Sequence, residues 1–113
     1  MRKTFLKDAT ILSVFDYQDN KKKLLGKMIF GIVIKDETNR FESGFRVITS
    51  TIKSQNHLEF KTKSGSYYVI NEEPEHFDLT FSEFVVMRNR LHSISEILEL
   101  RKALKLKDDR TIH

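Results

Sequence analysis

The sequence predicts an α+β protein, in which an antiparallel meander sheet of about five strands (residues 9–71) precedes helices (residues 80–106) that pack on one face of the sheet. Two observations support this fold class. The first part of the chain alternates β-branched and aromatic segments with polar turns, whereas the last part places apolar residues at helical spacing after two capping sequences. A length of 113 residues fits a single domain, 1–113, with one core.

The first two predicted strands form a hairpin. Residues 9–17, ATILSVFDY, are rich in strand-forming types, and the polar run QDNKKK that follows them predicts a turn. The second strand, about residues 24–35, contains the run MIFGIVI, which does not alternate and is typical of a central strand packed on both faces. The turn-rich cluster DETNRFESG then leads into a third strand, FRVITSTIK.

Residues 60–70, FKTKSGSYYVI, predict a second hairpin that turns at the glycine. A two-residue turn on either side of Gly65 gives the same pairing parity, and both versions place Phe60 and Val69 on the core side. The opposite face of this hairpin then carries Glu59, Lys61, Tyr68 and Ile70.

The register between the third and fourth strands is open. A two-residue loop, QN, and a three-residue loop, SQN, place opposite faces of the third strand inward. We favour the three-residue loop, which buries Ile48 and Ile52 and leaves Val47 beside Tyr68. The sheet face opposite the core then offers an apolar patch with charged neighbours, as interaction sites do. The candidate partner-binding residues on this face are Tyr68, Ile70, Lys61, Glu59 and Val47.

Two capping boxes predict where the helices begin. Thr80 is followed three residues later by Glu83, and Ser93 is followed in the same way by Glu96. Pro74, which has a fixed φ and no N–H, suits the connection out of the sheet. Residues 107–113, KDDRTIH, show no apolar periodicity and are predicted to fray.

The sequence contains no catalytic or cofactor motif. It has no Cys, which excludes disulfides, thiolate nucleophiles and Cys-ligated zinc. No Ser lies in a G-x-S-x-G elbow, and the four glycines form no phosphate-cradling loop. His76 and Asp78 lie near three glutamates, but no second His lies at ligand spacing, so we interpret these charges as favourable neighbours of a helix N-terminus. We expect no enzymatic activity, no cofactor and no bound metal.

Charge and hydropathy bear on partners and location. The net charge is +4 and the pI is near 9.4, but the basic residues are spread along the chain. Basic residues alternate with aromatic ones in FRV, FKTKSGSYY and KMIF, a pattern typical both of ordinary strands and of surfaces that contact nucleic acid. The longest apolar run is far shorter than the roughly 20 residues that span a bilayer. We expect no membrane contact, no signal peptide and a cytoplasmic location.

The segments STI and FKTKSGSYYVI, followed by LTFSEF, resemble small uncharacterised bacterial proteins of the mobile-element type. The resemblance covers about residues 45–90. It implies a bacterial cytoplasmic origin and a partner-blocking role, and it carries no catalytic or binding residues onto this chain. We therefore expect a non-enzymatic interaction protein that self-associates, for example as a homodimer, or binds a protein partner through its open sheet face. The alternative is a nucleic-acid-binding protein that uses basic and aromatic residues on the sheet.

Overall fold

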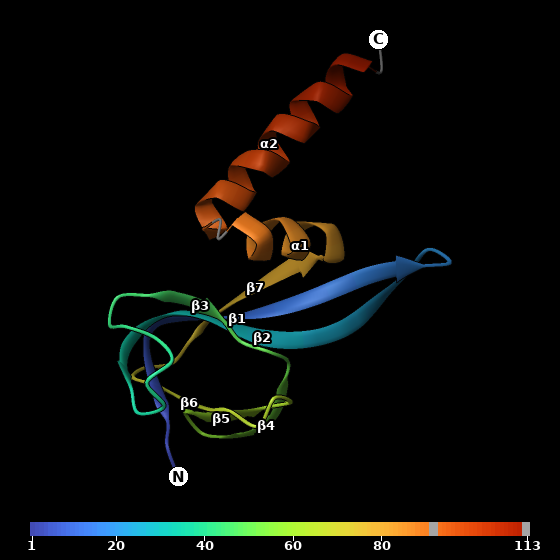
Figure 1. Ribbon diagram of the computed structural model, residues 1–113. Helices are drawn as coiled ribbons and strands as arrows, with labels where there is room; N and C mark the ends of the chain where they lie inside the picture. The colour runs from blue at the N-terminus through green and yellow to red at the C-terminus, as the bar shows by residue number, and fades with distance from the viewer. Residues whose placement is uncertain (91–92, 112–113) are drawn as a thin grey trace. The chain divides into compact units, whose positions relative to one another are not determined.

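The computed structural model describes the backbone of residues 1–90 and 93–111 and the side chains of residues 1–89 and 93–104. The chain divides into two compact units, Met1–Phe81 and Ser82–His113. The first unit contains seven strands in one mixed sheet, and the second contains two helices (Figure 1). The α+β class with C-terminal helices is confirmed, whereas the five-stranded antiparallel meander is wrong. That the helices pack on one sheet face, and that the chain forms one domain, stay predictions.

The long first strand organises the sheet. The strands are β1 (Thr4–Gln18), β2 (Lys21–Asp36), β3 (Arg46–Ile48), β4 (Ile52–Asn56), β5 (Glu59–Thr62), β6 (Tyr67–Ile70) and β7 (Glu75–Thr80). Their order is β3-β2-β1-β6-β5-β4, and β7 also pairs with β1. β1 is antiparallel to β2 but parallel to β6 along residues 4–6 and to β7 along residues 10–15. The sheet is mixed because β1 pairs antiparallel with one neighbour, β2, and parallel with two others, β6 and β7.

The sheet closes on itself through a short connection. β3 and β4, the two ends of the strand order, are joined by residues 49–51 alone. The N–H of Thr49 donates to the carbonyl of Ile29 on β2 at 3.0 Å, and the N–H of Lys63, next to β5, donates to the carbonyl of Thr51 at 2.9 Å. The predicted third strand, FRVITSTIK, is thus split into two strands by a bend. In Figure 1, β4, β5 and β6 lie opposite the curved β1–β2 hairpin.

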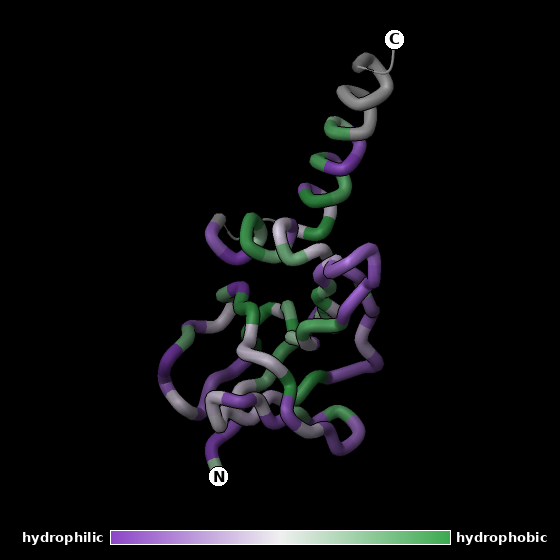
Figure 2. Tube along the Cα trace, turned by 90° about the vertical axis from the view of Figure 1, so that its right-hand side faces the viewer, coloured by the Kyte–Doolittle hydropathy of each residue, from purple (hydrophilic) through white to green (hydrophobic). Residues whose placement is uncertain are grey.

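The core of this unit lies inside the closed sheet. Its buried residues are Leu6, Ala9, Ile11, Ile29, Val33, Val47, Phe60, Tyr68 and Ile70. Hydrophobic stretches of the strands gather toward this interior in Figure 2, and hydrophilic stretches lie at the periphery. Nearly every strand of the closed sheet therefore contributes to one apolar cluster.

The favoured register between the third and fourth strands is wrong. Asn56 pairs with Glu59, so the loop has two residues, and the first of them, His57, has a φ of 55°. This loop, His57 and Leu58, lies beyond both loops that we considered and gives odd–even pairing next to the turn. A register shift between Ile52 and Ser54 then restores the favoured parity at Ile52, which pairs with Thr62 and packs against the core as expected. Val47 is buried for a different reason, because it lies on β3, which the bend at residues 49–51 separates from β4 and which pairs with β2.

The predicted face assignment of the second hairpin is also wrong. Lys61 pairs with Tyr67, and the Thr62 N–H donates to the carbonyl of Ser66, so residues 63–65 form a three-residue loop. Gly65 has a φ of 89° in this loop and donates its N–H to the carbonyl of Thr62 at 2.9 Å. A loop that is longer by one residue moves every side chain of the partner strand to the other face. Tyr68 therefore lies opposite Phe60, inside the core.

The first hairpin and the central position of β2 are confirmed. β1 and β2 are joined by Asp19 and Asn20, which have φ values of 53° and 64°. Positive φ at both turn residues is the geometry that suits the twist of a two-residue hairpin, and Asp and Asn tolerate it. Along residues 30–32, β2 is flanked by β1 and by β3.

The second unit contains α2 (Ile94–Thr111) and all of α1 (Phe81–Arg90) except its first residue, and both helices begin where the capping boxes predict. The Ser93 Oγ accepts from the Glu96 N–H at 3.2 Å, and the Glu96 carboxylate accepts from the Ser93 N–H at 3.3 Å. Arg101 of α2 donates two hydrogen bonds to Glu83 of α1, at 2.5 and 2.7 Å. The fraying predicted from residue 107 differs from the structure, where α2 continues to Thr111; residues 112–113 lie outside the described residues.

Asp36 organises the connection between β2 and β3. Its carboxylate accepts hydrogen bonds from the Thr4 hydroxyl (2.8 Å) and from backbone N–H groups, including those of Thr38 (2.9 Å) and Phe41 (2.8 Å). Burial raises the pKa of Asp36, but the hydrogen bonds from Thr38, Thr4 and Phe41 outweigh burial and hold the pKa well below its ordinary value of 3.8. The ionised form of Asp36 therefore stabilises the fold.

Replacement of Ser93 by Ala is expected to lower the stability of α2 by about 1 kcal/mol, because one N-terminal N–H loses its acceptor. The measurement is urea unfolding followed by the helical circular dichroism signal. Ser95→Ala, an exposed serine in the same turn, is the matched control and should leave the midpoint unchanged. Equal midpoints for the two variants would contradict the cap.

Replacement of Asp36 by Asn is expected to cost about 1–3 kcal/mol near neutral pH, because hydrogen bonds to a charged acceptor are lost. Since folding lowers the pKa of Asp36, its contribution is present above the ordinary value of 3.8 and is lost as the pH falls below it. Urea unfolding at a series of pH values should show a smaller loss of stability on acidification for Asp36→Asn than for the parent. Glu42→Gln, in the same connection, is the control, and an acid dependence identical to the parent in Asp36→Asn would contradict this role.

Candidate functional site

The predicted partner-binding residues do not form one exposed surface. Tyr68 is 4% exposed, Ile70 is 1% exposed and Val47 is 6% exposed, and all three belong to the core. Three of the five candidates therefore cannot meet a partner without unfolding the closed sheet. The three-residue loop at Gly65 explains the error at Tyr68 and Ile70, and the pairing of the separate strand β3 with β2 explains the error at Val47.

The other two candidates, Glu59 and Lys61, lie on the outer surface of the sheet. The Glu59 carboxylate is 3.0 Å from the Lys3 ammonium, and the Lys61 ammonium lies 5.5 Å from the centre of the Tyr67 ring. Beside them is a pocket of about 340 Å³, lined by Ser54, Gln55, Asn56, Glu59, Lys61 and Tyr67. Apart from the Tyr67 ring, the residues that line this pocket are polar or charged, so the outer surface lacks the buried aromatic anchor that we expected from Tyr68.

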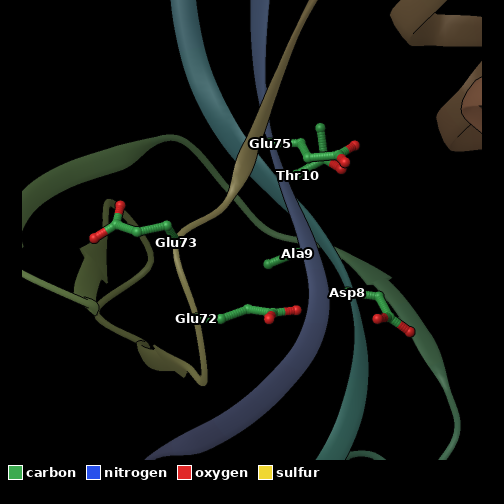
Figure 3. Close-up of a pocket in the computed structure, with 6 residues that line it drawn as sticks. All are labelled: Asp8, Ala9, Thr10, Glu72, Glu73 and Glu75. Atoms are coloured by element: carbon green, nitrogen blue, oxygen red, sulfur yellow. The ribbon is translucent and has the colours of Figure 1, made fainter.

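An acidic pocket of about 340 Å³ lies where β1 bulges, and its lining is shown in Figure 3. Asp8, with a φ of 51°, belongs to the bulge, Glu72 and Glu73 come from the β6–β7 connection, and Glu75 begins β7. Figure 3 shows the Glu73 and Asp8 side chains pointing in opposite directions rather than toward a common point. Divergent carboxylates of this kind do not enclose an ion.

His76 and Asp78, which we interpreted as preceding a helix, instead lie on β7 beside Ile11 and Ser13 of β1. Both side chains are exposed, and the Asp78 carboxylate lies 3.6 Å from the Lys22 ammonium. Among the described residues, no group of three or more His, Asp or Glu side chains is placed to hold a metal ion.

The distal part of the β1–β2 hairpin carries the most distinctive surface of the first unit. We call residues 16–25 the arm. β7 pairs with β1 only as far as Phe15, and β3 pairs with β2 only along residues 30–32. The hairpin therefore extends beyond its neighbouring strands (Figure 1).

The arm exposes apolar and basic side chains together. Tyr17 is 61% exposed, Leu24 is 47% exposed and Leu25 is 43% exposed. Lys21, Lys22 and Lys23 are exposed on the returning strand.

A cation–π contact ties the base of the arm together. The Lys22 ammonium lies 4.1 Å from the centre of the Phe15 ring. Phe15 pairs with Leu24 across the ribbon, and Tyr17 pairs with Lys22, so these four side chains share one face. An aromatic and aliphatic surface with a lysine at its centre results.

The arm is not predicted from the sequence, because the polar run QDNKKK indicates a turn over its whole length. In the structure only Asp19 and Asn20 turn, and the lysines already belong to β2. The dipeptide Asp-Asn was the available signal, since these two residue types accept positive φ and so locate a two-residue turn.

No family model, no curated protein and no solved structure matches this chain. The resemblance of residues 45–90 to bacterial mobile-element proteins therefore stays a prediction. Within the described residues, neither helix is both long enough and apolar enough to span a membrane.

Two adjacent tyrosines test the face assignment directly. Tyr68→Ala is expected to cost about 3–5 kcal/mol, because it leaves a cavity among Phe60 and Ile70 in the core. Tyr67→Ala removes a half-buried ring from the opposite face and is expected to cost about 1 kcal/mol or less. Chemical unfolding of both variants measures the difference, and the reverse order of costs would restore our original assignment.

Proposed function

We propose that the protein is a non-enzymatic interaction protein that binds a protein partner through the arm. The observation that carries this proposal is the joint exposure of Tyr17, Leu24 and Leu25 on a hairpin that extends beyond its neighbouring strands. Single exposed apolar residues are common on protein surfaces, but Tyr17 and Leu24 share one face of this short ribbon, and Leu25 is exposed in the adjoining bulge.

Contact with a partner would also stabilise the ribbon itself. A two-stranded hairpin with no further layer is marginally stable in water. Burial of a leucine side chain contributes about 1.5–3 kcal/mol, so coverage of Leu24 and Leu25 offers a substantial gain. Tyr17 adds a rigid ring with a polar tip, a combination that is frequent at energetic hot spots of interfaces. These properties replace the role that we first predicted for Tyr68.

A second candidate function is nucleic-acid binding, and the lysines of the arm favour it. Lys21, Lys22 and Lys23 are consecutive and exposed, and Tyr17 could stack on a base beside them. Affinity that depends on phosphate contacts falls steeply with added salt, whereas affinity from apolar burial does not. Salt dependence therefore distinguishes the two candidates.

The remaining expectations belong to this proposal. Self-association as a homodimer, a cytoplasmic location and a partner-blocking role in a bacterium are all compatible with a small binding module. Light scattering on the parent protein addresses self-association, because a second copy bound through the arm would raise the mass in a concentration-dependent way.

The test of the arm is recovery of the partner from native cells by affinity purification. The double variant Tyr17→Ala/Leu24→Lys is expected to reduce recovery of the proteins that copurify with the parent by about tenfold or more, since hot-spot residues dominate binding. Val86→Lys, which changes an exposed apolar residue of α1, is the control and should retain them. Both variants should keep the parental melting temperature. Full recovery with the arm variant would show that the binding surface lies elsewhere.

A further inference from the structure

We infer that the arm binds an extended acidic segment of its partner as an added strand along the outer edge of β2 at residues 21–25. This inference rests on the proposed function, because it assumes that the arm binds a protein. It specifies the backbone geometry of the contact and the chemistry of the segment that fits.

The outer edge of β2 offers main-chain groups along the arm. Its other edge pairs with β1, and β3 covers the outer edge only at residues 30–32. Within the part of the chain that the structure describes, no strand pairs with residues 21–25 on the outer side. In an antiparallel pair, every second residue directs its N–H and C=O away from the partner strand. These groups form a row of alternating donors and acceptors that an extended peptide can pair with.

Two features limit the length of this unpaired edge. Val14 pairs with Gly26 and Phe15 pairs with Leu24, so Leu25 is an additional residue that bulges from the ladder. A Cβ atom at Gly26 would lie 2.9 Å from the Thr51 side chain, which shows how closely the closed sheet approaches β2 at that point. The edge therefore begins at the turn and ends where the closed sheet starts.

The lysines determine the charge of the segment that fits. Side chains alternate between the faces of a strand, so Lys21 and Lys23 lie on one face and Lys22 lies with Leu24 on the other. Opposite charges stabilise cross-strand pairs, and like charges directly opposite destabilise them. The lysines of a second arm would repel this edge, as lysines on edge strands generally prevent self-pairing. The occupant is thus an acidic strand rather than a second copy of this edge.

Acidic side chains of the protein itself also face these lysines. Asp16 pairs with Lys23 across the ribbon, Asp19 lies in the turn, and Asp78 of β7 is paired with Lys22. Lys21 pairs with Gln18, so it has an uncharged neighbour across the ribbon. Lys21 is consequently the best residue for a reversal of charge, and Lys23 is better changed to an uncharged residue because a glutamate there would lie opposite Asp16. Both changes leave the Lys22–Asp78 ion pair intact.

The edge favours a peptide over a nucleic acid. A phosphate backbone presents acceptors only, so it would leave the carbonyl groups of the edge without donors. A peptide backbone supplies both donors and acceptors at the spacing of a strand. Leu24 and Tyr17 add an apolar surface next to Lys22, which suits a segment that alternates acidic and apolar residues.

The probe for the test is a short fluorescent peptide of alternating glutamate and valine, with binding measured by anisotropy. Two modified peptides accompany it: one carries N-methyl groups on its central backbone amides and keeps every charge, and the other has lysine in place of glutamate. We expect the unmodified peptide to bind and each modified peptide to bind at least about tenfold more weakly. A duplex oligonucleotide with the same label represents the other class of ligand.

Variants of the protein complete the test. Lys21→Glu/Lys23→Gln is expected to weaken peptide binding by about tenfold or more, whereas Lys35→Glu, exposed at the other end of β2, should leave it unchanged. Peptide binding should also slow amide hydrogen exchange at residues 21–25. Equal affinity for the N-methylated peptide, or tighter binding of the oligonucleotide than of the peptide, would overturn the added strand.

The failure of this inference can be told apart from failure of the proposed function. If the peptide does not bind but the Tyr17→Ala/Leu24→Lys variant loses the cellular partner, the arm is the binding surface and the added strand is wrong. If that variant keeps the partner, the proposed function is wrong as well, because the partner then binds outside the arm.

Discussion

The bend at residues 49–51 is the constraint on which the first unit depends. The Thr49 Oγ accepts from the Ile29 N–H at 3.0 Å and donates to the carbonyl of Ser50 at 2.8 Å, so one threonine fixes the bend from both sides. The Ser50 hydroxyl then lies 3.1 Å from that of Ser64, in the loop between β5 and β6. Because this bend joins β3 to β4, it converts an open row of strands into a closed sheet with an enclosed core. Without it the two terminal strands would be edges with one exposed apolar face each.

The arm follows from the difference in length between β1, β2 and the strands that they pair with. β6 and β7 together occupy β1 only up to Phe15, and the closed sheet occupies β2 only from about Gly26 onward. The remaining residues of the hairpin do not contribute to the core, so core packing does not constrain which side chains they carry. The first unit thus contains an enclosed core and a ribbon with an open edge. The core supplies the stability of the fold, and the ribbon supplies the proposed binding surface.

Local signals in the sequence predicted local structure well. The strand composition and the Ser93–Glu96 box act over a few residues, and each is found where it was expected. Pairing between distant segments was less predictable. The parallel contacts of β1 with β6 and β7 leave no composition signal, and the position of Gly65 within a two- or three-residue loop decided whether Tyr68 or Tyr67 is buried. One residue of loop length, rather than any property of Tyr68, removed the predicted site.

The parallel pairing of β1 has a further consequence for the order in which the chain can fold. Residues 4–6 pair with residues 68–70, and residues 10–15 pair with residues 75–80. The first strand therefore cannot form these pairs until segments more than sixty residues later have been synthesised. Contacts between such distant segments require a large loop to close and slow folding. On the ribosome, the β1–β2 hairpin can form early from local contacts, but one edge of β1 stays uncovered until β6 and β7 have emerged. In the nascent chain, chaperones would therefore meet β1 as an apolar strand with one free edge.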